Sequence, residues 1–167
     1  AYRFIKKFGE PIYSWQLQLV NGELLRKQIK DDKEVILDAD WTTIRSYENK
    51  KEGSEKGYNK LRPGQPCFQA SQFFANGYAI DPELVGGKTM PKTEEFLHKR
   101  LNRIRYLIGR IDLFRGDSAY CSEKNLRMLD NFTRTSRGRD KIQFIISSKV
   151  SSKGAKECFR KAKTRAW

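Results

Sequence analysis

The chain has 167 residues, 38% of them hydrophobic, and its 34 Lys and Arg outnumber its 20 Asp and Glu to give a formal net charge of +14. This length and composition predict one domain with a hydrophobic core and argue against two full domains. The positive charge favours a polyanionic partner, with nucleic acid as the first candidate, because it attracts phosphates and displaces their counterions.

The first part of the chain is expected to supply a helix, a strand and a loop. Residues 1–33 mix apolar and basic positions and predict a helical lead-in. In the strand that follows, the two-residue alternation places Ile36, Asp38 and Asp40 on one face. Residues 48–66 are rich in Lys, Gly and Pro, which predicts a long basic loop. Two aspartates are therefore expected to point the same way from one strand.

A hairpin and an amphipathic helix are expected next. Residues 68–76 and 78–85 are typical of two short strands, with Gly77 between them at the turn. A helix is predicted to open at Pro91. Its apolar positions recur at helical spacing and form a stripe that faces the sheet: Leu97, Leu101, Ile104 and Ile108. The basic residues of the same helix are expected to stay outside that stripe: Arg100, Arg103 and Arg105.

The remaining chain alternates strands and helices. Residues 111–114 predict a strand, Ser122 is a plausible N-cap for the next helix, and residues 141–148 predict a fifth strand before a final basic helix. This order is that of an α/β fold with a ribonuclease H-like mixed five-stranded sheet flanked by helices, which would occupy residues 34–167. Crossover connections in such a sheet would bring the ends of its first and fourth strands side by side.

Cysteine usage and hydropathy narrow the class of protein. Cys67, Cys121 and Cys158 are widely spaced and lack a Cys-x-x-Cys pattern, which argues against a disulfide framework and a zinc site and fits a reducing compartment. No apolar run approaches the roughly 20 residues of a membrane span, and the first residues lack the apolar core of a signal peptide. We therefore expect a soluble intracellular protein without a membrane partner.

Two aspartates at strand ends are the candidate metal ligands. Asp40 and Asp117 are far apart in the sequence, so only the fold could bring them together. Mg²⁺ takes oxygen ligands, and metal-assisted phosphodiester chemistry uses carboxylates that converge from distant segments. The alternative is that Asp38 and Asp40 are solvated acids at a strand end and that Asp117 is a turn residue before a helix. Spacing alone leaves both interpretations open.

Several short motifs, in this order and rough spacing, resemble the DDE transposases of bacterial insertion sequences. They are Leu37-Asp-Ala-Asp-Trp-Thr42, Lys56-Gly-Tyr-Asn59 with Arg62-Pro-Gly-Gln-Pro66, Gly86-Gly-Lys-Thr89, and Arg115-Gly-Asp-Ser-Ala-Tyr120 with Phe144-Ile-Ile-Ser-Ser-Lys149. The resemblance implies that Asp40 and Asp117 are the first and second catalytic acids and metal ligands, with Asp38 as a neighbour that tunes the site. The third acid of the family, a Glu in a later helix, has no match before Trp167, so the chain is expected to be a fragment.

The same resemblance implies an activity and its partners. The activity would be metal-dependent DNA strand cleavage and strand transfer at transposon ends, with Mg²⁺ or Mn²⁺ as cofactor. Double-stranded DNA, as transposon ends and as target, would be the partner, with a homodimer assembled on it in the bacterial cytoplasm at the nucleoid. Two alternatives stay open, a non-catalytic DNA-binding remnant of a transposase and another ribonuclease H-like nuclease.

Two basic segments are the candidate DNA contacts. The loop interleaves basic residues with an aromatic ring that could stack on an unpaired base: Lys56, Tyr58, Lys60 and Arg62. The final helix aligns basic residues on one face, where they could follow phosphates: Lys153, Lys156, Arg160 and Lys163. In both segments the alternative is a solvated surface. His98, the single histidine, borders an apolar stripe and is expected to be structural.

Overall fold

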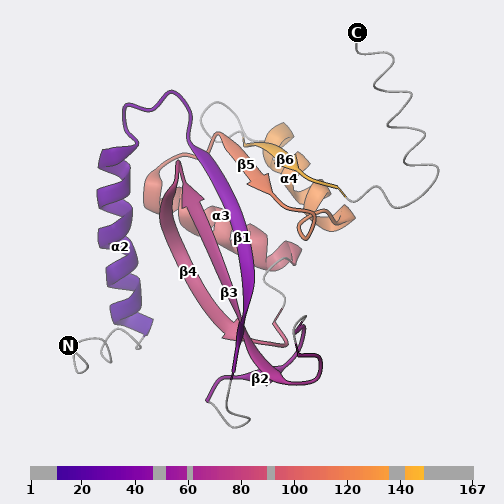
Figure 1. Cartoon of the computed structure of the whole chain (residues 1–167). Helices are drawn as coiled ribbons and strands as arrows, with labels where there is room; N and C mark the ends of the chain where they lie inside the picture. Colours follow the sequence, from indigo (N-terminus) through magenta and orange to yellow (C-terminus); the bar gives the residue numbers. More distant parts are fainter. Residues whose placement is uncertain (1–10, 47–51, 60–61, 90–92, 136–141, 149–167) are drawn as a thin grey trace, which may run out of the picture.

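A mixed β-sheet of six strands forms the centre of the computed structural model, which describes residues 11–46, 52–59, 62–89, 93–135 and 142–148 (Figure 1). The strands are β1 (Ile36–Arg45), β2 (Glu55–Lys56), β3 (Pro66–Ala75), β4 (Tyr78–Gly86), β5 (Leu113–Gly116) and β6 (Gln143–Ile146). β1 pairs antiparallel with β3 and parallel with β5, which in turn pairs parallel with β6. β3 also pairs antiparallel with β4 and with β2.

This topology confirms the predicted α/β, ribonuclease H-like fold. The first strand lies at the centre, with the antiparallel hairpin on one side and the two parallel strands on the other. The predicted number of five strands is wrong by one, because β2 lies inside the segment that we expected to be loop. Its two residues pair with Pro66 and Cys67 at the start of β3. A strand of only two residues has no periodicity that a sequence pattern could reveal.

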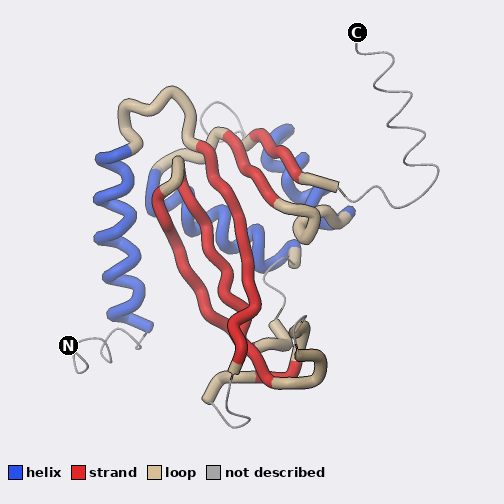
Figure 2. The backbone as a smooth tube through the Cα atoms, viewed as in Figure 1, coloured by secondary structure: helices blue, strands red, loops and turns tan. Residues whose placement is uncertain are grey.

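Three helices accompany the sheet: α2 (Pro11–Gln28), α3 (Glu94–Ile108) and α4 (Glu123–Thr135). Figures 1 and 2 show α3 and α4 behind the sheet and α2 alongside its β4 edge, where α2 contacts both α3 and β4. No described helix is long and apolar enough to cross a membrane. The predicted boundary at residue 33 stays a prediction, although Leu25 and Ile29, which precede it, join the same core cluster as the sheet.

The core lies between the sheet and the two helices behind it. β1 contributes Leu37 and Ala39, and the neighbouring strands contribute Phe73, Ala75 and Phe114. On the opposite face of the sheet, Ile44, Leu84 and Ile145 are exposed to 46%, 58% and 60%. The register places all three on the face that carries Asp38 and Thr42 of β1. Ile44 alternates with these residues along β1, Leu84 pairs with Ala70 opposite Thr42, and Ile145 pairs with Arg115 opposite Asp38. None of the described helices covers them.

The predicted hairpin is confirmed, and its turn has a clear physical basis. Asn76 and Gly77 both have positive φ, 48° and 87°, as a two-residue turn between right-twisted strands requires. The Asn76 side chain also anchors the turn, since its Oδ1 accepts a 2.7 Å hydrogen bond from the Ile36 backbone N–H. The strands are longer than expected and begin at Pro66 and end at Gly86.

The helix stripe is confirmed, and one of its predicted exposed residues is wrong. Leu97, Leu101, Ile104 and Ile108 are buried as expected, and Thr93 is the N-cap, whereas Pro91 lies outside the described residues. Arg100, however, is fully buried, because two carboxylates of β4 meet its guanidinium inside the core. Sequence reasoning places a charged helix residue at the surface, because such residues are rarely buried without a partner. The carboxylates that pair with Arg100 lie on a different element, β4, so the sequence of the helix could not reveal them.

The next two elements lie close to their predicted positions. The fourth major strand runs over Leu113–Gly116 instead of 111–114, because Asp112 accepts a 2.7 Å hydrogen bond from the Val35 N–H just before the strands pair. Ser122 caps the following helix as expected, with its Oγ accepting from the Asn125 N–H at 3.3 Å. The shift places Arg115 and Gly116 within the strand, directly before Asp117.

Candidate metal site and nucleic-acid interface

Asp40 lies in the middle of β1, and Asp117 directly follows the end of the neighbouring parallel strand β5. In the β1–β5 register, Ala39 pairs with Gly116, and Asp40 and Asp117 are the next residues along the two chains. Neighbouring strands are about 4.8 Å apart, so the backbones of the two aspartates are adjacent. The fold thus brings together two acids that are distant in the sequence, as the parallel arrangement predicted.

Each carboxylate is oriented by one backbone hydrogen bond. Asp40 Oδ1 accepts from the Trp41 N–H and Asp117 Oδ1 from the Ala119 N–H, both at 2.8 Å. Both side chains are exposed. Within the described residues, Oδ2 of each has no hydrogen bond, which leaves an oxygen on both acids for a ligand. Carboxylate oxygens are the donors that Mg²⁺ and Mn²⁺ prefer, so the pair fits such an ion.

The described segments place no third His, Cys, Asp or Glu side chain so that it completes a metal site with this pair. No group of three His, Cys, Asp or Glu side chains that could hold a metal occurs among them. The two aspartates could therefore form part of a coordination shell, with water or substrate oxygens completing it, as is usual for Mg²⁺.

Asp38 is engaged by a residue that the sequence analysis did not single out. Arg115, which pairs with Asp38 across the β1–β5 ladder, donates from Nε and Nη2 to its two carboxylate oxygens at 2.6 and 2.7 Å. The hydrogen bond and charge of Asp38 raise the pKa of the Arg115 guanidinium. Both oxygens of Asp38 are thus engaged by Arg115, and the role of Asp38 as a neighbour that tunes the site stays a prediction. The sequence contains one signal that could have identified Arg115, its position two residues before Asp117 in an Arg-x-Asp pattern.

The basic loop approaches β1 just beyond the acid pair. The ring of Tyr58 lies 5.9 Å from that of Trp41, the residue after Asp40. The Tyr58 carbonyl accepts hydrogen bonds from Gln69 Nε2 at 2.8 Å and from Thr43 Oγ1 at 3.4 Å. About half of the Tyr58 side chain stays exposed, at 49%, so one face of the ring remains available for stacking.

The other predicted DNA contacts have different outcomes. Lys56 and Arg62 are exposed, and the Arg62 N–H donates to Asn59 Oδ1 at 3.0 Å. Lys60 and the predicted final helix lie outside the described residues, and with them Lys153, Lys156, Arg160 and Lys163. His98 is exposed, and its ring lies 5.4 Å from that of Phe132.

Two of the sequence motifs pack backbone against backbone. A Cβ added at Gly57 would lie 1.8 Å from the backbone carbonyl oxygen of Gly87, and one added at Gly87 would lie 2.3 Å from the backbone carbonyl oxygen of Glu55. Side chains cannot be accommodated at these distances. The Lys56-Gly-Tyr-Asn59 and Gly86-Gly-Lys-Thr89 segments therefore depend on their glycines to hold the loop in place beside β1.

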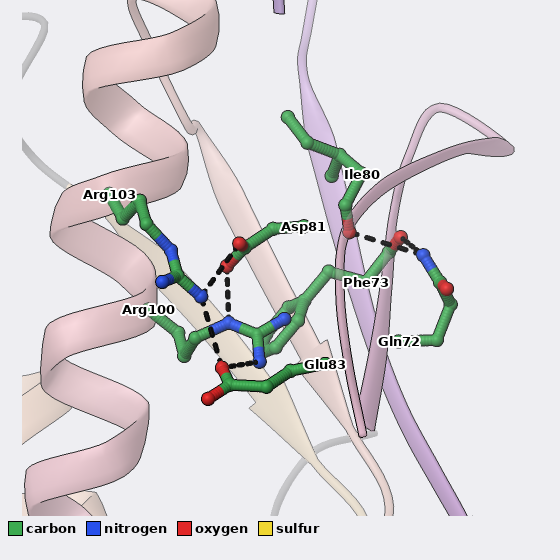
Figure 3. Close-up of polar contacts among 7 residues, drawn as sticks. All are labelled: Gln72, Phe73, Ile80, Asp81, Glu83, Arg100 and Arg103. Carbon is green, nitrogen blue, oxygen red and sulfur yellow. Dashed lines mark hydrogen bonds and ion pairs between the residues drawn. The ribbon is translucent and has the colours of Figure 1, made fainter. Parts of the chain in front are cut away.

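A buried ionic cluster connects β4 to α3, and we call it the Arg100 cluster: Asp81, Glu83, Arg100 and Arg103 (Figure 3). Arg100 Nε donates to Asp81, Arg100 Nη1 donates to Glu83 at 2.7 Å, and Arg103 Nη2 lies 2.7 Å from Asp81 Oδ1. Burial raises the pKa of Asp81 and lowers that of Arg100 against their mutual attraction. The Arg100 guanidinium also lies 4.8 Å from the centre of the Phe73 ring.

Comparison with known proteins gives likenesses to solved structures. No family model and no curated protein matches the chain. Among the solved structures, the Mos1 mariner transposase paired-end complex with Mn shares 11% identity at a TM-score of 0.41, over 90% of this chain and 54% of its own. The catalytic domain of Mos1 mariner transposase shares 11% sequence identity at a TM-score of 0.43, over 89% of this chain and 69% of its own. The piggyBac transposase synaptic complex with hairpin DNA shares 12% sequence identity at a TM-score of 0.46, over 75% of this chain and 25% of its own.

The chain spans about half the length of the Mos1 paired-end structure. At these identities and scores, function has to be argued from the site itself.

Proposed function

We propose that this chain is a catalytic-core segment of a DNA transposase that cleaves DNA strands at transposon ends and transfers them to target DNA. The observation that carries the proposal is that Asp40 of β1 lies beside Asp117, the residue that directly follows β5. It is supported by the predicted and observed ribonuclease H-like strand order and by the motif resemblance around both acids. The proposal includes Mg²⁺ or Mn²⁺ as cofactor and double-stranded DNA as partner.

The residues of the site have distinct roles in this proposal. Asp40 and Asp117 would hold the metal through their carboxylate oxygens, and the Trp41 and Ala119 N–H groups orient those carboxylates. A bound divalent ion would supply an activated water or 3′-hydroxyl and would stabilise the leaving oxygen. Lys56 and Arg62 would hold phosphates, and Tyr58 would stack on an unpaired base. A homodimer on DNA, in the bacterial cytoplasm, is part of the same proposal.

A second candidate is a DNA-binding protein of the same fold that does not catalyse. It is favoured by the absence of a third acid beside Asp40 and Asp117 among the described residues. Both candidates bind DNA, but only the transposase requires a metal at the two aspartates. A nuclease of the same fold would also use the metal, and it would cut DNA without joining strands.

The test of the proposal is a calorimetric Mn²⁺ titration of the wild-type chain and of Asp40→Asn and Asp117→Asn. Each substitution keeps the size of the side chain and removes its charge. We expect the Mn²⁺ affinity to fall in each variant by more than the ~10-fold lower limit seen when an outer-shell partner is lost, because a direct ligand is removed.

Asp31→Asn is the matched control, since Asp31 is an exposed acid with a weak surface contact to Lys30 at 3.8 Å. Its Mn²⁺ affinity should equal that of the wild type. Equal affinities for wild type, Asp40→Asn and Asp117→Asn would overturn the proposal and leave the DNA-binding candidate.

The loop contacts make a separate prediction about DNA binding. We expect the slope of log affinity against log salt to become shallower by about 0.9 in Lys56→Ala and in Arg62→Ala, because each loses one phosphate contact. Fluorescence anisotropy with a labelled duplex over a series of salt concentrations measures the slope. Lys30→Ala, a surface change away from the loop, should keep the wild-type slope. A loop that is only solvated would leave all three slopes alike.

A further inference from the structure

We infer that the outward face of α2 is a docking surface for a second copy of this chain. The inference deepens the proposed function, on which it rests, by naming the contact of the homodimer. Apolar residues recur along α2 at spacings of four, three and four residues, and we call them the α2 stripe: Tyr13, Leu17, Val20 and Leu24. This spacing places all four on one side of a helix and is typical of the seam between two paired helices.

The α2 stripe faces away from the rest of the fold. Its four side chains are exposed to between 39% and 58%, whereas Gly22 and Leu25 of the same helix are buried. Figure 1 shows α2 at the outside of the molecule, beside the β4 edge of the sheet. A helix with apolar residues on both faces is normally buried on both. The stripe therefore indicates a partner that lies beyond the described residues.

The opposite face of α2 is fixed on α3, so the stripe is held in place. Arg26 Nη2 donates to the backbone carbonyl oxygens of Tyr106 and Leu107, at 3.0 and 2.9 Å. These carbonyls belong to the last turn of α3, where the helix itself supplies no donor. Gly22 lets the two helices approach closely, because a Cβ there would lie 3.0 Å from Leu107 Cβ. A helix that is already fixed loses little freedom when it pairs.

The charges along α2 favour an antiparallel pair of copies. The helix carries Glu23, Arg26 and Lys27, so it contributes only +1 to the net charge of +14 and repels a second copy less than other surfaces would. Lys27 follows the stripe one turn after Leu24, and in a parallel pair the two Lys27 side chains would face each other. An antiparallel pair centred on the stripe separates them by about 25 Å, well beyond the Debye length of about 8 Å at 0.15 M salt.

The stripe is complementary to itself in this arrangement. Two-fold symmetry places Tyr13 opposite Leu24 and Leu17 opposite Val20 of the second copy. The four side chains expose roughly 300–400 Å² per copy, at about 150–200 Å² for each large side chain when fully exposed. Because about 60% of an interface is apolar, the pair would bury about 1,000–1,300 Å² in total. This is the lower limit for a specific interface, so we expect a weak dimer with a Kd in the micromolar range.

The experiment is sedimentation equilibrium of the chain without DNA or metal, at 0.15 M salt and at concentrations that reach about 100 μM. We expect the wild type to show a monomer–dimer equilibrium. Leu17→Gln and Leu24→Gln should each raise the Kd at least about 10-fold, because two-fold symmetry counts each change twice. Leu and Gln have similar helix propensities, so α2 is kept, which circular dichroism checks.

Two further variants serve as controls. Leu84→Gln is matched to Leu24→Gln, because both side chains are 58% exposed, but Leu84 lies on the uncovered face of the sheet, so the Kd should stay unchanged. Lys27→Gln should also keep the wild-type Kd, and a tighter dimer in this variant would overturn the antiparallel arrangement. A wild type that stays monomeric throughout, or equal losses in Leu24→Gln and Leu84→Gln, would overturn the inference and assign the stripe to another partner.

The outcome can be separated from that of the proposed function, because it needs neither metal nor DNA. If Asp40→Asn and Asp117→Asn bound Mn²⁺ like the wild type while the chain paired through α2, the proposed function would fail and the α2 contact would stand. If the two aspartates held Mn²⁺ and the chain stayed monomeric, the α2 contact alone would fail.

Discussion

Arg100→Met is expected to lower the free energy of unfolding by about 3 kcal/mol, the lower end of the range for breaking a buried ion pair. Asp81 is fully buried and would lose one of its two cationic partners, while Arg103 would remain. The aliphatic part of Met fills much of the volume that the Arg side chain occupied, so the loss reports the charge. Urea denaturation followed by circular dichroism measures it.

A double variant and a surface control make this result specific. Asp81→Asn with Arg100→Met should be less destabilised than the sum of the single changes, because the carboxylate that needed Arg100 is gone. Arg127→Met removes an exposed pair with Glu123, at 2.6 Å, and should cost no more than about 0.5 kcal/mol. Additive effects at Asp81 and Arg100 would contradict the coupling that the ion pair implies.

Gly57→Ala is expected to displace the loop that carries Tyr58. The new Cβ would fall 1.8 Å from the Gly87 carbonyl oxygen, and because that atom is backbone it has no rotamer through which to move away. We expect a loss of about 3 kcal/mol, the upper part of the usual range for overpacking. The emission of Trp41 should change as well, since the Tyr58 ring lies 5.9 Å away.

Gly64→Ala is the control for this substitution. Gly64 has a positive φ of 81° but open space around its Cβ position, so Ala there costs only the backbone strain of about 1–2 kcal/mol. It should leave the Trp41 emission unchanged. Equal losses in the two variants, with the same emission spectrum, would show that the loop does not depend on the contact between Gly57 and Gly87.

Much of the fold could be predicted because its signals are local. The stripe from Leu97 to Ile108 and the turn at Gly77 are short-range patterns, and the structure confirms both. Asn76, which the sequence pattern places in the first strand of the hairpin, also belongs to the turn. The burial of Arg100 could not be predicted, since its partners Asp81 and Glu83 belong to a strand whose distance from the helix is set by the whole sheet. β2 was missed for the opposite reason, because two residues are too few for a pattern.

The candidate site shows the same division. The meeting of Asp40 and Asp117 follows from one rule about parallel neighbours, which needs only the order of the elements. The contact between Arg115 and Asp38 depends on the exact register of β1 and β5. The sequence pattern predicts no register, and it places the strand β5 two residues too early.

The uncovered side of the sheet, with Ile44, Leu84 and Ile145, affects how the molecule behaves in solution. At low ionic strength the charge of +14 keeps copies apart, but at about 1 M salt the Debye length shrinks to roughly 3 Å and this repulsion is lost. The exposed apolar side chains of different copies of the chain can then associate. High salt therefore weakens DNA binding and also promotes self-association of the protein. A loss of the DNA-binding signal at high salt can come from either effect, and light scattering on the same samples distinguishes them.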